Sequence, residues 1–204
     1  MRTFAVILLL ASLFAANCCE PPMPPTDEEM IQLFNTHKAA FGEIYEIIAG
    51  SSEGSFHYPP LSPDGIIILD PATQEIELSD ETNDEQDIPV YGLLKPERIL
   101  LDSLLSEIGC GSLLVDRRVC GTSDSVYVSF VMPYYSHSIV DAGTSKSFVY
   151  DPGLRSRRDI HITEHGDLNE IYRRTCNDTT LYKPIKENWY IELEHSRYTE
   201  VMNK

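Results

Sequence analysis

The sequence predicts a single α+β domain in which a mainly antiparallel sheet packs against two amphipathic helices. Two observations predict this class. Apolar residues recur every three or four positions over residues 30–48 and 99–108, and beyond residue 112 the apolar period changes to two. A third observation supports one domain: the chain has 204 residues, 42% of them hydrophobic, which is enough for one buried core.

Start and stop residues bound both helices. Thr26 and Glu29 have the spacing of a capping box, which marks the start of the first helix, and Gly50 is a residue that typically ends a helix. The second helix has Pro96 in its first turn and Gly109 just past its end. A third, short helix is expected from Asp167 to Arg174. Strands are expected near residues 66–69, 75–78, 112–118, 125–132, 145–151 and 186–193, the first two as a hairpin and the last four as a meander.

The first 25 residues precede this domain, which we place at residues 26–204. Phe4–Ala16 is an apolar run too short to span a bilayer, so residues 1–17 are expected to be a signal peptide that is removed. The run ends at Ala15-Ala16-Asn17-Cys18, which resembles the cleavage site of bacterial lipoproteins and predicts acylation of Cys18. Residues 18–25 would be the anchor and a semi-rigid spacer, since residues 20–25 contain four prolines. The alternative is an ordinary soluble secreted protein.

Charge and cysteine content restrict the partners and the compartment. The chain has 16 Lys and Arg against 32 Asp and Glu, a formal charge of −16, which argues against a nucleic-acid partner. Five cysteines in an exported chain suggest a disulfide. In the expected meander Cys110 and Cys120 lie about 25 Å apart at opposite ends of one strand, so we predict a bond between Cys120 and Cys176. A Cys110–Cys120 bond is the alternative and would need a chain reversal at Asp116-Arg117.

Two groups of residues are candidates for chemistry. His161-Ile162-Thr163-Glu164-His165 matches the pattern of inverted zinc peptidases, but alternating Ile160 and Ile162 favour a strand, in which the histidines lie about 13 Å apart. We therefore expect no metal, no cofactor and no catalytic residue. The second group is a set of basic residues that would suit a carboxylate or phosphate, although pairing with the chain's own acids is favoured. Its members are Lys146, Arg155, Arg157 and Arg158.

Several segments also resemble a group of small bacterial envelope lipoproteins. The segments are DEEMIQLFNTHKAAFGEIYEIIA, PERILLDSLLSEIG, SKSFVYDP and YKPIKENWYIELEH. The resemblance implies an envelope location and an α+β domain, and it brings no catalytic residue because no activity is assigned to the group.

Together these patterns favour an exported protein held by an N-terminal lipid on the periplasmic side of a membrane, with a non-catalytic binding or scaffolding role toward an envelope protein. An inhibitor or capture protein for a basic periplasmic partner is the alternative, because the acidic charge would accelerate such an association. A zinc hydrolase that uses His161 and His165 is a third, less favoured alternative.

Overall fold

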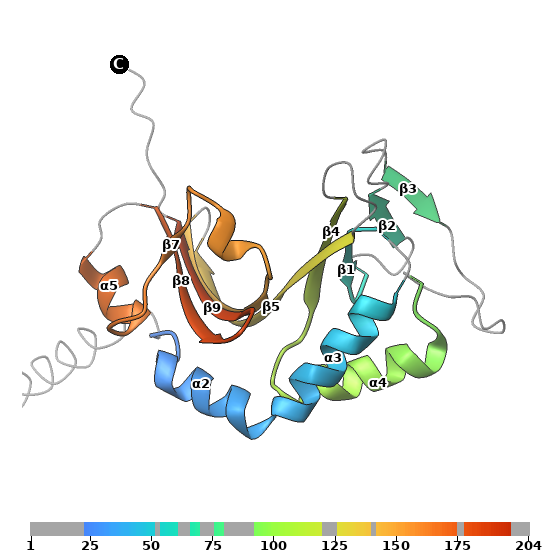
Figure 1. Ribbon diagram of the computed structural model, residues 1–204, viewed down its shortest axis with the longest axis horizontal. Coiled ribbons are helices and arrows are strands. Elements are labelled where there is room, and N and C mark those ends of the chain that lie inside the picture. Colours follow the sequence, from blue (N-terminus) through green and yellow to red (C-terminus); the bar gives the residue numbers. More distant parts are fainter. Residues whose placement is uncertain are drawn as a thin grey trace, which may run out of the picture.

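A computed structural model describes residues 23–51, 54–60, 66–69, 76–79, 92–119, 126–139, 142–174 and 178–196. They form one large sheet in the order β1-β4-β5-β6-β9-β8-β7 and a separate two-stranded sheet, β2-β3 (Figure 1). Neighbours in the large sheet are antiparallel except β7 and β8, which confirms the predicted α+β class. The strands of the large sheet are β1 (Phe56–Tyr58), β4 (Leu113–Val119), β5 (Val126–Ile139), β6 (Ala142–Tyr150), β7 (His161–Ile162), β8 (Thr179–Lys186) and β9 (Trp189–Ser196).

The first predicted helix is two helices, α2 (Asp27–Thr36) and α3 (Lys38–Gly50), separated at His37. The capping box forms as predicted: the Thr26 hydroxyl accepts a hydrogen bond from the Glu29 N–H at 3.2 Å, and the Glu29 carboxylate accepts one from the Thr26 N–H at 2.7 Å. The other predicted helices are α4 (Lys95–Glu107) and α5 (Leu168–Arg174), which are confirmed. No helix in the described part of the chain is both long and apolar enough to cross a membrane.

The expected strand order is also confirmed, and the sheet extends beyond it. The hairpin is β2 (Ile66–Leu69) with β3 (Ile76–Ser79), and the meander is β4-β5-β6-β9. Strands β1 and β8 were not predicted, whereas β7 agrees with the strand that the alternation of Ile160 and Ile162 favours. The register shifts between Pro133 and Tyr135 in β5 and between Pro184 and Lys186 in β8. Such bulges bend strands, and the sheet is strongly curved (Figure 1).

Aromatic side chains fill the space between the sheet and helices α2 and α3. The Trp189 ring lies 5.3 Å from Phe41 and 5.5 Å from Phe34, both on the helices, measured between ring centroids. From the sheet, Tyr150 lies 5.2 Å and Phe130 5.5 Å from the same ring. On the opposite face, Leu154, which follows β6 in a short 3-10 helix, packs with Val149 and Tyr190. The sheet is therefore covered on both faces along part of its length.

The backbone at Gly109, just past the end of α4, has a conformation that favours glycine. This residue has φ +74°, and a Cβ added to it would lie 3.2 Å from the Tyr134 ring. We expect Gly109→Ala to lower the free energy of unfolding by about 1–2 kcal/mol, because a left-handed conformation is costly for residues with a Cβ. Gly111→Ala is the matched control, since a Cβ there has nothing within 4 Å. Urea denaturation compares them, and equal midpoints for the two variants would contradict the prediction.

Candidate functional site

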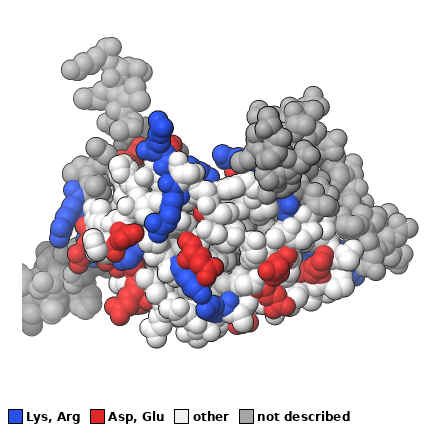
Figure 2. Space-filling model, viewed as in Figure 1, with Lys and Arg blue, Asp and Glu red and all other residues white. Residues whose placement is uncertain are grey.

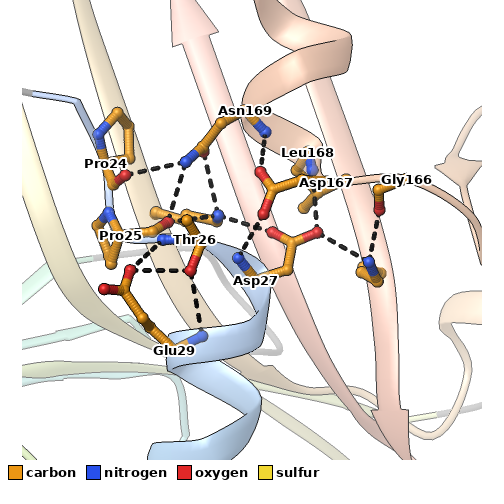
Figure 3. A network of polar contacts seen from close by, with 11 residues as sticks. Pro24, Pro25, Thr26, Asp27, Glu29, Gly166, Asp167, Leu168 and Asn169 are labelled. Carbon is orange, nitrogen blue, oxygen red and sulfur yellow. Dashed lines mark hydrogen bonds and ion pairs between the residues drawn. The ribbon is translucent and has the colours of Figure 1, made fainter.

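A buried cluster of charged and polar side chains lies where the described chain begins (Figure 3). We call it the Asp27 cluster, and it consists of Asp27, Lys146, Asn169 and Lys183. The exposed fractions are 2% for Asp27, 0% for Lys146 and 6% for Asn169. Lys183 lies at the edge, with 17% of its side chain exposed. Charged groups are rarely buried to this extent unless they are paired, so the contacts inside the cluster decide its role.

The Asp27 carboxylate holds the cluster together. Its Oδ1 lies 2.7 Å from Lys146 Nζ, and its Oδ2 lies 3.0 Å from Lys183 Nζ. The backbone N–H of Leu168, at the start of α5, donates to Oδ2 at 2.9 Å. In return, the backbone N–H of Asp27 donates to Asp167 Oδ2 at 2.8 Å. The first residues of α2 and α5, about 140 positions apart in sequence, are thus bound to each other.

Lys146 and Asn169 bind the chain that leads into α2. The Lys146 ammonium donates to the carbonyl oxygen of Pro25 at 2.7 Å and to Asn169 Oδ1 at 3.1 Å. The Asn169 amide nitrogen donates to the carbonyls of Pro24 at 2.9 Å and Pro25 at 3.1 Å. Lys146 belongs to the middle of β6, so the N-terminal segment is attached directly to the large sheet. This attachment fixes the point and direction at which the chain enters the domain.

The predicted anion-binding residues do not form one site. Lys146 is fully buried in the Asp27 cluster and is unavailable to an external anion. Arg157 lies 2.8 Å from the buried carboxylate of Asp151, and Arg155 lies 3.9 Å from Glu164. Arg158 is exposed. The grouping was wrong for Lys146, because side chains alternate along β6 and Lys146 lies on the same buried face as Phe148. The pairing of two arginines with acids agrees with the alternative.

The histidine motif does not adopt the helical geometry that a zinc peptidase needs. His161 is exposed in the two-residue strand β7, and His165 is exposed in the bend that follows. Thr163 donates through its hydroxyl to the carbonyl of His165 at 3.0 Å, so the segment turns. Among the described residues, no group of three or more His, Cys, Asp or Glu side chains is placed to hold a metal ion.

Of the cysteines, the structure describes Cys110 alone. It is a free, buried thiol, and burial raises its pKa to about 12, so it is protonated and unreactive at neutral pH. Cys18, predicted to be lipidated, and Cys120 and Cys176, predicted to form a disulfide, lie outside the described residues.

The face of the sheet opposite the helices carries a small polar hollow of about 160 Å³. Ser136, Ser145 and Glu194 form one cross-strand row beside it, and Gly143 and Ser196 are paired in the row beyond. The absence of a side chain on Gly143 leaves space between these polar groups.

On the face seen in Figure 2, Lys and Arg side chains lie among Asp and Glu side chains, so the described surface there has mixed charge.

Glu192, two residues from Glu194 on β9, is a half-buried carboxyl with a raised pKa. Burial is the largest cause, the charge of Glu194 acts in the same direction, and a hydrogen bond with Tyr182 opposes it. An acid with a raised pKa in the folded state binds more protons there than when unfolded. The contribution of Glu192 to the free energy of unfolding therefore falls as the pH rises above about 4.3, the ordinary pKa of a glutamate side chain.

We expect Glu192→Gln to stabilise the protein at neutral pH and to have little effect below about pH 4, where the carboxyl is protonated in both states. The measurement is the urea midpoint as a function of pH. Glu170→Gln serves as the control, because Glu170 is exposed and its charge is not among the causes of the raised pKa of Glu192. A midpoint for Glu192→Gln that is lower than wild type at neutral pH would contradict the assignment.

Comparison with known proteins identifies the family of the chain. A domain of unknown function, DUF4948, matches residues 23–197, which contain every helix and strand described above. Searches of curated proteins and of solved structures found no significant match. The match starts at Met23, directly before the prolines that the Asp27 cluster binds. Because it covers most of the chain, the protein belongs to the DUF4948 family of uncharacterised domains.

Proposed function

We propose that the protein is an exported, lipid-anchored bacterial envelope protein that acts as a non-catalytic binding or scaffolding module. The apolar run Phe4–Ala16 and the residues before Cys18 support export and acylation. The proline-rich residues 20–25 support a spacer between the lipid and the domain. An anchored module needs a firm connection between its tether and its folded domain.

The attachment of Pro24 and Pro25 is the observation that carries the proposal. Both carbonyls accept hydrogen bonds from side chains of the Asp27 cluster, directly after the predicted spacer. Cys18 precedes Pro24 by six residues, which span at most about 20 Å when extended. A lipid on Cys18 would therefore keep this end of the domain close to the membrane. A force on the tether would be transmitted to the sheet through Lys146. The same contacts would protect the first turn of α2 from fraying.

The test is mass spectrometry and fractionation of the full chain expressed in a bacterial host. We expect the mature wild-type protein to be in the membrane fraction, to begin at Cys18 and to carry added acyl mass there. Cys18→Ser should abolish both the acyl mass and the membrane association. Cys19→Ser is the matched control, because the neighbouring thiol is not the predicted acylation site, and it should behave as wild type. Unmodified wild-type protein in the soluble fraction would refute the anchor.

A further inference from the structure

We propose that Lys146 and Asn169 join through an intramolecular isopeptide bond, in which the Lys146 side-chain nitrogen replaces the amide nitrogen of Asn169. The proposal does not depend on the export or anchoring of the chain. It rests on three observations in the Asp27 cluster. The first two are the position of the amine relative to the amide and the neighbouring carboxylate, whose contacts are among the dashed lines of Figure 3. The third is the burial of all three side chains.

The nucleophile and the electrophile are already in contact. Lys146 Nζ lies 3.1 Å from Asn169 Oδ1. Since a C=O bond is about 1.2 Å long, Nζ is at most about 4.3 Å from the amide carbon that it would attack. The Asn169 nitrogen points the other way and donates to Pro24 and Pro25, so the amide oxygen faces Lys146. This fixed orientation removes most of the entropic barrier to a reaction between the two side chains.

Asp27 is placed to move the protons. Attack requires the neutral amine, and Asp27 Oδ1 lies 2.7 Å from Lys146 Nζ, where it can accept a proton from the ammonium. Lys183 and the Leu168 N–H contact the other oxygen, Oδ2, and so hold the carboxylate in position without occupying Oδ1. Burial excludes water, which would otherwise compete as a nucleophile and solvate the ammonium.

The reaction balances without any co-reactant. Asp27 takes one proton from the Lys146 ammonium, and the neutral amine attacks Cγ of Asn169 to form a tetrahedral intermediate. The bond between Cγ and Nδ2 then breaks, and the second Nζ proton and the proton on Asp27 both go to the leaving nitrogen. The products are a secondary amide between Lys146 and Asn169, an ammonium ion and the Asp27 carboxylate. The bond would join β6 to α5 beside the point where the N-terminal segment enters.

The test is tryptic mapping of the denatured full-length protein by mass spectrometry. Lys146 is the only tryptic site between Arg118 and Arg155, and Asn169 lies in the peptide 159–173. We expect no cleavage after Lys146, and a linked species of peptides 119–155 and 159–173 that is lighter than their sum by one ammonia. Cleavage after Lys146, with an unmodified peptide 159–173, would overturn the proposal. A link from Lys146 to Asp27 with loss of water would also overturn it.

Variants separate the roles of the three side chains. Lys146→Arg keeps the positive charge but replaces the nucleophilic amine with a guanidinium group. Asp27→Asn removes the proton acceptor and keeps nearly the same side-chain size. Both should lose the linked species. Lys186→Arg is the matched control, because it makes the same replacement on β8 at a more exposed residue, whose ammonium lies 3.4 Å from the Glu187 carboxylate, and it should keep the link. Circular dichroism verifies that each variant is folded. A linked species of undiminished yield in Asp27→Asn would refute the role of Asp27 as proton acceptor. Whether the isopeptide bond exists is decided by the mapping of the wild-type protein alone.

Discussion

Replacement of Asp27 by alanine is expected to lower the free energy of unfolding by about 3–5 kcal/mol, because it leaves buried cations without their carboxylate. Lys146 is completely buried and Lys183 is mostly buried, and both have Asp27 as their acidic partner. The variant also loses the hydrogen bond from the Leu168 N–H and, by the proposal above, the isopeptide bond. Urea denaturation measures the loss through the fluorescence of Trp189, the single tryptophan, which lies in the core.

Glu170→Ala is the matched control for this prediction. Glu170 is also an acid near the start of α5, but it is exposed, and its carboxylate lies 4.0 Å from Arg174. An exposed pair of this kind contributes little, so we expect a change within about 0.5 kcal/mol. If the two variants had the same unfolding midpoint, the Asp27 cluster would have no special part in stability.

The sequence contained one unused signal for the burial of Lys146. Side chains alternate between the two faces of a strand, so Lys146 shares a face with Phe148 and Tyr150. Phe148 is buried in the core and Tyr150 packs against it, and the same period places Lys146 on that face too. Its charge instead suggested a surface cation grouped with Arg155, Arg157 and Arg158. The partners that make burial tolerable, Asp27 and Asn169, lie far away in sequence, and no local pattern reveals such a pairing.

Local signals located most helices and strands, and the misses have physical causes. The apolar period of residues 30–48 continues through His37, so it predicts one helix. The break depends on tertiary structure, where His37 Nδ1 lies 2.8 Å from Glu107 Oε1 at the end of α4. Strand β8 contains Pro184, which argues against a strand because proline lacks an N–H. Here the register shifts between Pro184 and Lys186, and a bulge accommodates the proline.

Replacement of Phe41 by alanine is expected to cost about 3–5 kcal/mol of unfolding free energy, because it opens a cavity among rings that the helices and sheet share. Phe41 is fully buried on α3. Its ring centroid lies 4.7 Å from Phe34, 4.9 Å from Phe148 and 5.3 Å from Trp189, so one side chain connects α2, β6 and β9. Removing it takes away contacts on three sides at once, and a close-packed interior closes such a space only partly.

Phe41→Leu provides the control for cavity size at the same position. Leucine keeps much of the apolar volume and loses the edge-to-face ring contacts with Phe148 and Trp189, so its cost should be clearly smaller than that of alanine. Both variants are measured by urea denaturation with Trp189 fluorescence, and the native emission also reports on packing next to position 41. If alanine and leucine cost the same, ring contacts rather than cavity volume would determine the stability of this core.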